Sequence, residues 1–189
     1  ARYSLVADVD VEAALEKANR LATQISHPAL DAFRGRLIAE TADEVAFEEW
    51  LEGVTSETKK QPEYWSAIGL RLVRSGRDKE AIRALGEAVK LDPTDRASLR
   101  LLVAALERTG DGKLAAFVRK NLATLDQLFR IASVADQSQV MWIAEQLQGL
   151  VRPWESLGWY QHAVQMQGGD PRSSSQLSER LNQIAAWEK

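Results

Sequence analysis

The stretch PEYWSAIGLRLVRSGRDKEAIRALGEAVKLDPTD, residues 62–95, decides the fold. Apolar side chains recur in it at helical spacing on both sides of Gly76, which predicts two amphipathic helices joined by a turn. Gly69 and Ala81 are small enough to let two antiparallel helices approach closely. Gly76 can adopt the left-handed conformation that ends the first helix, and Pro93 ends the second because proline cannot continue a helix.

This stretch resembles one tetratricopeptide repeat, a helix–turn–helix unit of about 34 residues. The residues at its signature positions are Trp65, Ile68, Gly69, Leu72, Gly76, Ala81, Leu85, Ala88 and Pro93. The resemblance implies an all-α fold in which helical hairpins stack as a right-handed superhelical solenoid. No alternating strand pattern competes with it.

Weaker units flank this repeat when the frame moves by one period. Forward, Gly110 and Ala115 occupy the turn position and the small-residue position. Backward, Pro28 and Gly35 occupy the opening and a small-residue position, but Phe47 stands where a small alanine belongs. We therefore expect one ordinary and one degenerate repeat beside the clear one.

The frame drifts further along the chain. Residues 142–150 predict another first helix, and Pro153 opens the second helix that follows it. In that second helix Ser156, Tyr160 and Ala163 reproduce the small–aromatic–small spacing of the repeat. A short insertion is needed to bring this unit into register.

Together these units predict a single repeat domain of about nine helices over residues 1–189. Its expected parts are a partial repeat at 10–27, a degenerate repeat at 28–61, the clear repeat at 62–95, a repeat at 96–129, a degenerate repeat at 130–166 and a capping helix at 173–189.

Bulk properties narrow the function. The 189 residues carry a net charge of −3 and no cysteine, which excludes disulfides, thiolate nucleophiles and cysteine metal sites. We expect no membrane span and no secretory signal, because no sufficiently long apolar run exists. The missing initiator methionine indicates a piece of a longer protein, and the compartment stays open.

Catalytic parts are sparse, so we expect no enzyme, no cofactor and no metal. The two histidines, His27 and His162, have no carboxylate or second histidine at metal-ligand spacing. No phosphate-binding or dinucleotide glycine motif and no nucleophile elbow is present. A carboxylate cluster is expected on the solvated side of a helix whose inner side carries Phe47, Trp50 and Leu51; it consists of Asp43, Glu44, Glu48 and Glu49.

Six tryptophans are many for a chain of this size, and tryptophan is common at binding hot spots. We expect Trp50, Trp154 and Trp159 to pack in helical cores. Trp142 and Trp187 are the freer candidates for an interface.

The resemblance also implies where a partner would bind, because first helices line the concave face of such stacks. The partner-facing positions are Glu63, Ser66, Leu70, Val73 and Arg74 in the clear repeat, and Ala97, Arg100, Ala104, Glu107 and Arg108 in the next. Chaperone-binding members of the family carry Lys and Asn at such sites, whereas Ser66 and Leu70 stand here. The carboxylate clamp is absent, and a groove of mixed apolar and arginine character is expected.

Three hypotheses follow. The leading one is a protein-interaction scaffold that holds a peptide or helix of another protein. Nucleic-acid binding is the second, motivated by arginines at 71, 74, 77, 83, 96, 100 and 108 but opposed by interleaved acids and the net charge. The third is a structural module that self-associates weakly through its terminal helices. A looser resemblance is to repeat segments of large bacterial proteins with propeller-type domains, which would imply an extracytoplasmic parent. It rests on Trp65 with Gly69, on Gly149 followed by Pro153-Trp154-Glu155, and on Gly158-Trp159-Tyr160.

Overall fold

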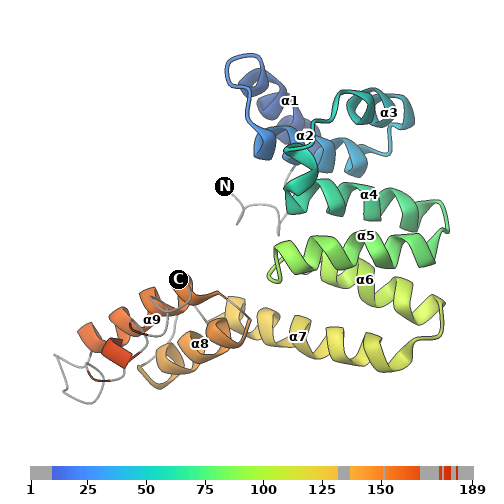
Figure 1. The fold of residues 1–189 in the computed structure, drawn as a ribbon. Coiled ribbons are helices and arrows are strands. Elements are labelled where there is room, and N and C mark those ends of the chain that lie inside the picture. Colours follow the sequence, from blue (N-terminus) through green and yellow to red (C-terminus); the bar gives the residue numbers. More distant parts are fainter. Residues whose placement is uncertain are drawn as a thin grey trace. The chain divides into compact units, whose positions relative to one another are not determined.

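The computed structural model describes residues 10–131, 137–150 and 152–166, together with 175, 177–179 and 182. This part of the chain holds nine α-helices, one 3-10 helix and no strand, so the all-α prediction is confirmed (Figure 1). The chain divides into two compact units, 1–119 and 120–189, and we describe each by itself. The single domain over 1–189 stays a prediction.

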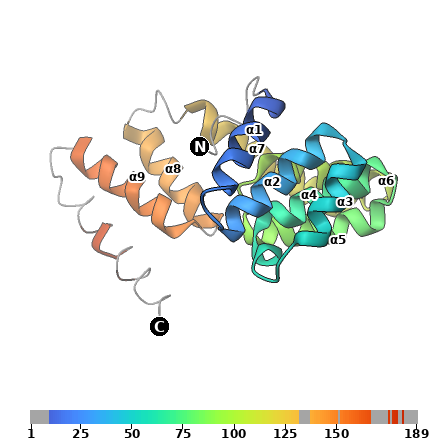
Figure 2. The same cartoon turned by 90° about the horizontal axis from the view of Figure 1, so that it is seen from above.

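The helices follow the predicted repeat frame. They are α1 (Val11–Ala22), α2 (Pro28–Thr41), α3 (Glu44–Gly53), η2 (Thr58–Lys60), α4 (Pro62–Arg74), α5 (Asp78–Leu91), α6 (Arg96–Arg108), α7 (Gly112–Ile131), α8 (Gln137–Gly149) and α9 (Pro153–Met166). In the first unit α1 packs on α2, α2 on α4, α4 on α5 and α5 on α6 (Figures 1 and 2). The predicted capping helix at 173–189 lies almost wholly outside the described residues.

Side chains at the helix starts explain where the helices begin. Asp10 and Asp43 each accept a hydrogen bond of 3.0 Å from the backbone amide three residues ahead, which caps α1 and α3. His27 caps α2, since its Nδ1 accepts from the amide of Ala29 at 3.2 Å. Pro28 follows at the first helical position, where its missing N–H costs nothing. His27 is thus a capping residue on the surface.

Three residues one repeat apart end the first helix of each hairpin. Ala42, Gly76 and Gly110 have φ angles of 61°, 69° and 84°, in the left-handed region. Glycine reaches that region without strain, which confirms the role predicted for Gly76. Ala42 holds the same conformation in the degenerate repeat, so its turn keeps the repeat geometry without the glycine.

Two glycines allow the helices of a hairpin to touch. A Cβ on Gly69 would lie 2.5 Å from Cγ and Cδ2 of Leu85 across the α4–α5 hairpin. A Cβ on Gly35 would lie 2.0 Å from the ring of Trp50 on α3. The predicted close approach at Gly69 is therefore confirmed, and the degenerate repeat uses the same device with a larger opposing side chain.

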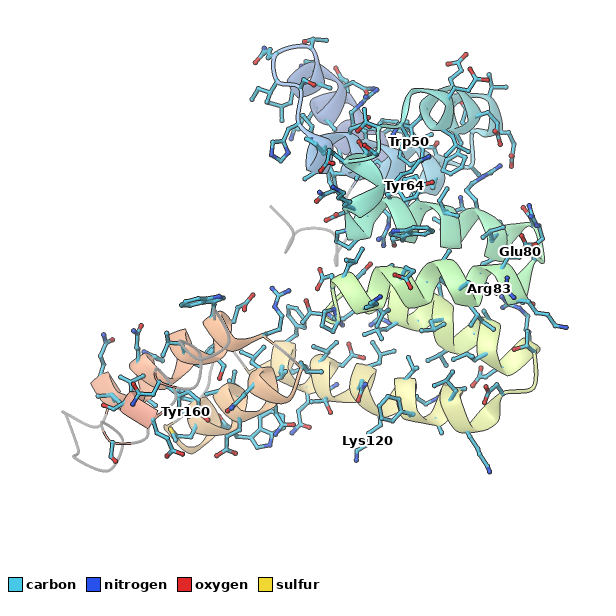
Figure 3. The ribbon with its side chains drawn as sticks, in the orientation of Figure 1. Trp50, Tyr64, Glu80, Arg83, Lys120 and Tyr160 are labelled. Atoms are coloured by element: carbon cyan, nitrogen blue, oxygen red, sulfur yellow. The ribbon has the colours of Figure 1, made fainter. Side chains whose placement is uncertain are left out.

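One core cluster of the first unit lies between α2, α3 and α4. Phe47, Trp50, Tyr64 and Trp65 form a run of aromatic contacts there, with ring centroids 5.3, 5.9 and 5.2 Å apart. Trp50 and Tyr64 are labelled close together in Figure 3. Trp50 is 7% exposed and its indole N–H donates to the carbonyl of Asp31 at 3.2 Å. The expected burial of Trp50 is confirmed. Phe47, which stands where the repeat has a small alanine, is buried in the same cluster.

The second unit contains one complete hairpin, α8–α9 (Figure 2). Ser156, Tyr160 and Ala163 are buried as predicted, and the Ser156 hydroxyl donates to the carbonyl of Ala144 at 2.7 Å. The predicted start of α8 at 142 was too late, because α8 begins at Gln137. The expectation that Trp154 packs in a core was wrong, because 58% of it is exposed.

The drift of the frame has a local cause. Pro93 follows Asp92 at the end of α5, whereas Gln127 stands one period later. Without that proline the second helix of the third repeat continues, and α7 runs to Ile131. The next first helix therefore begins later than strict periodicity predicts.

Candidate functional site

The partner-facing positions of the clear repeat are largely closed by the chain itself. Ser66 is fully buried and Leu70 is 6% exposed. The expectation that these two residues face a partner was therefore wrong. Glu63 and Val73 are half-buried, and Arg74 has an exposed guanidinium that is already engaged.

Ser66 is buried because a polar cluster joins three successive first helices. Its hydroxyl lies 2.6 Å from the Ser98 hydroxyl on α6 and receives a hydrogen bond from Arg36 on α2. Asp95, at the start of α6, accepts from Arg36 at 3.0 Å and from the Ser98 hydroxyl at 2.6 Å. We call Arg36, Ser66, Asp95 and Ser98 the inter-repeat cluster.

Asp95 carries the negative charge of this cluster. Burial by itself would raise the pKa of Asp95, but the attraction of Arg36 and the hydrogen bonds from Ser98 and Arg36 outweigh it and hold the pKa below its ordinary value. The other carboxylate oxygen caps α6 by accepting from the amides of Ala97 and Ser98. The carboxylate is thus charged, paired and fully used inside the stack.

Arg74 closes the other end of the same face. Its guanidinium donates to the backbone carbonyls of Ala39 and Glu40 at the end of α2 and lies 3.8 Å from the Glu40 carboxylate. A cation at a helix C-terminus satisfies carbonyls that have no partner within the helix. Arg74 therefore ties α4 to α2.

The equivalent positions on α6 are more open. Ala97 and Ala104 are half-buried, and Arg100 is exposed. These residues and Glu107 follow one another at spacings of three and four, which places them along one face of α6. We call Ala97, Arg100, Ala104 and Glu107 the α6 row.

Charged residues at the ends of α6 are paired. Glu107 binds Arg119 of α7, and Arg108 donates to Asp78 of α5 at 2.6 and 2.9 Å. The hydrogen bonds from Arg108 hold the pKa of Asp78 below its ordinary value. Arg108 is therefore committed to fixing α6 against α5 and is a weaker candidate for partner contact than the middle of the row.

Several of the arginines that motivated nucleic-acid binding also have carboxylate partners. Arg71 binds Glu44 and lies over the Phe47 ring, with 5.0 Å between the guanidinium carbon and the ring centroid. Three further ion pairs join Arg74 to Glu40, Arg77 to Glu80 and Arg108 to Asp78. Pairing offsets their positive charge at the surface.

No metal-binding cluster is found in the part of the chain that the structure describes. There, no three His, Asp or Glu side chains come close enough to hold a metal ion. His162 is exposed and lies edge-on to Trp159, with centroids 6.1 Å apart. None of the described helices is both long and apolar enough to cross a membrane. The carboxylates Glu44, Glu48 and Glu49 are exposed as expected.

Sequence reasoning missed the inter-repeat cluster. Asp95 could have been read as a helix cap, since it directly precedes α6. Arg36 gave no such signal, because its partner lies far along the chain and the repeat frame does not pair those positions.

Comparison with known families places this geometry in context. The family model described as "Bacterial transcriptional activator domain" matches residues 4–125, which is well over half of the chain and includes α1 to α6 and most of α7. The comparison with curated proteins found no match. The model that matches differs from the tetratricopeptide repeat suggested by the sequence, while the helical-repeat character of the fold agrees with it.

Proposed function

Since the chain belongs to the family of bacterial transcriptional activator domains, we propose that it is the protein-interaction part of such an activator and binds a helix or extended segment of a partner protein. The α6 row is the surface we assign to that partner. The family carries the name of a regulatory role and not of a catalysed reaction, which agrees with a binding module.

The observation that carries this proposal is the contrast between α4 and α6. On α4 the middle of the predicted face is covered, since Ser66 lies under Arg36 and Ser98 and Leu70 packs into the α2–α3–α4 core. On α6 the matching residues, Arg100 and Ala104, stay accessible. Within the first unit, α6 is thus the first helix of a hairpin whose face a partner can cover.

The chemistry of the α6 row suits a helix or an extended chain. Ala97 and Ala104 are small, so a partner backbone can approach α6 closely. Arg100 and Glu107 border them with charges of both signs, which favours a partner with complementary charges over a uniformly anionic one. The pairing of Arg71, Arg77 and Arg108 with carboxylates also favours a protein partner over nucleic acid, because a phosphate backbone needs uncompensated cations.

The test is capture of partners by the full chain, compared with the variant Arg100→Glu plus Ala104→Arg. Arg83→Glu is the matched control, because Arg83 is exposed on the neighbouring helix α5 and lies outside the α6 row (Figure 3). A crosslinking residue at position 104 identifies the segment that binds. We expect a protein held by the wild type and the control and lost by the α6 variant.

Two outcomes would count against the proposal. Equal capture by all three proteins would remove the α6 row as the site. Binding of duplex DNA that weakens steeply with salt and with the Arg100→Glu change would assign the same face to nucleic acid.

A further inference from the structure

Exposed apolar side chains mark both ends of the first unit. On α7, Phe117 is 61% exposed and Leu114, one turn earlier, is 42% exposed. On α3, Val45 is 68% exposed. The opposite side of each helix faces the core. Ala115 and Val118 are buried on α7, and Phe47 and Trp50 are buried on α3. The exposed side chains are therefore additional to the core-facing stripes of their helices.

The charges around these side chains have opposite signs. Lys113 and Lys120 lie four residues before and three residues after Phe117, on the same side of α7, and Lys120 points outward in Figure 3. We call Lys113, Leu114, Phe117 and Lys120 the α7 patch. Both lysines are exposed.

The acidic counterpart lies on α3. Glu48, Glu49 and Glu52 follow Val45 by three, four and seven residues, so all four lie on one side of the helix, and all are exposed. We call Val45, Glu48, Glu49 and Glu52 the α3 patch. Opposite it, Phe47 and Trp50 are buried.

Neither set of charges is used inside the described part of the chain. Ion pairs near these residues involve other side chains, such as Arg71 with Glu44 and Arg119 with Glu107. The two lysines of the α7 patch and the three glutamates of the α3 patch form no ion pair there. Each patch thus combines an exposed apolar centre with charges that form no ion pair within the described residues.

We propose that the α7 patch of one copy of this chain docks on the α3 patch of a second copy. Phe117 and Leu114 pack against Val45, and the lysines lie against Glu48, Glu49 and Glu52. Because the two patches are different surfaces, each copy offers one of each, and the contact is heterologous. This self-association does not involve the α6 row, so it is independent of the proposed partner site.

The experiment is sedimentation equilibrium of the full chain over a concentration series at low and high salt. We expect an average mass that rises above the monomer with concentration and falls with added salt, because the lysine–glutamate attraction is screened. Phe117→Ser weakens the association at least about tenfold, as for a central interface aromatic. Leu91→Ser, at an exposed leucine on α5 outside both patches, leaves it unchanged.

Charge reversal tests the pairing itself. Glu48→Lys plus Glu49→Lys, and separately Lys113→Glu plus Lys120→Glu, each yield monomers, whereas an equimolar mixture of the two variants associates again. Far-ultraviolet circular dichroism checks that every variant stays helical, which exposed positions permit. A wild type that is monomeric at all concentrations overturns the proposal, and so does a mixture that fails to associate.

Discussion

Replacing Gly35 with alanine tests the packing of the degenerate repeat most directly. The new Cβ would lie 2.0 Å from the Trp50 ring, whereas carbon atoms normally stand about 3.5–4.0 Å apart. The ring must therefore move by more than 1 Å relative to α2, because the three atoms nearest to the new Cβ all belong to the Trp50 indole. The shift pulls the indole N–H away from the Asp31 carbonyl, now at 3.2 Å, and disturbs the contacts with Phe47 and Tyr64.

The magnitude follows from three effects. Overpacking a well-filled core costs about 1–3 kcal/mol. The lost indole hydrogen bond adds about 1 kcal/mol. Alanine returns about 1 kcal/mol because it favours the helix over glycine. We expect Gly35→Ala to lower the free energy of unfolding by about 1–3 kcal/mol, because the last two effects nearly cancel.

The assay is urea unfolding followed by circular dichroism for the helices and by tryptophan fluorescence for the core. Gly86→Ala is the matched control, because Gly86 lies within α5 and a Cβ there meets no atom within 4 Å. The control should gain about 0.5–1 kcal/mol. A Gly35→Ala protein as stable as the wild type would refute the account of the α2–α3 contact.

Three further predictions concern polar groups and the turn. Asp95 has a lowered pKa in the folded protein, so its pairing with Arg36 stabilises the fold fully above the ordinary pKa of 3.8, and this stability is lost as the pH falls through the folded pKa. In thermal melts from neutral to acid pH, the melting temperature of Asp95→Asn should therefore depend less steeply on pH than that of the wild type. An equally steep dependence would contradict the assignment. Arg74→Ala removes the hydrogen bonds to the end of α2 and should lower the free energy of unfolding in urea by about 1 kcal/mol. Arg83→Ala should change this free energy little. Equal losses of stability in the two variants would argue against a specific role of Arg74. Gly76→Ala places a side chain at a φ of 69° and should cost about 1 kcal/mol by the same measurement, with no loss if the turn can relax.

Much of the fold could be predicted because its signals are local. Gly76 ends a helix and Pro93 ends the next through their own backbone chemistry, so their positions in the sequence predict the turn directly. Gly69 and Ala81 are small because two helices cross there, and both are buried in the structure. The same reasoning extends to Ser156 in the α8–α9 hairpin.

The site was harder to predict because it depends on residues far apart in the chain. A repeat frame states which side of a helix Ser66 and Leu70 lie on, but not what covers that side. Arg36 of the degenerate repeat and Ser98 of the following repeat cover Ser66. Leu70 packs into the core cluster that contains Phe47 and Trp50 of the degenerate repeat. The exposure of Trp154 was missed for a related reason, since helical spacing does not show whether a neighbouring element is present.

The inter-repeat cluster has a consequence for cooperativity. In most repeat stacks each unit contacts only its nearest neighbours, so the stack can fray from its ends one unit at a time. Here the ion pair between Arg36 on α2 and Asp95 on α6 joins units that are not adjacent in sequence, with Ser66 of α4 between them. Loosening the first hairpin therefore weakens the third as well as the second. In hydrogen exchange, the amides of the three hairpins should therefore share one opening free energy and not show a stepwise decrease from the ends of the stack.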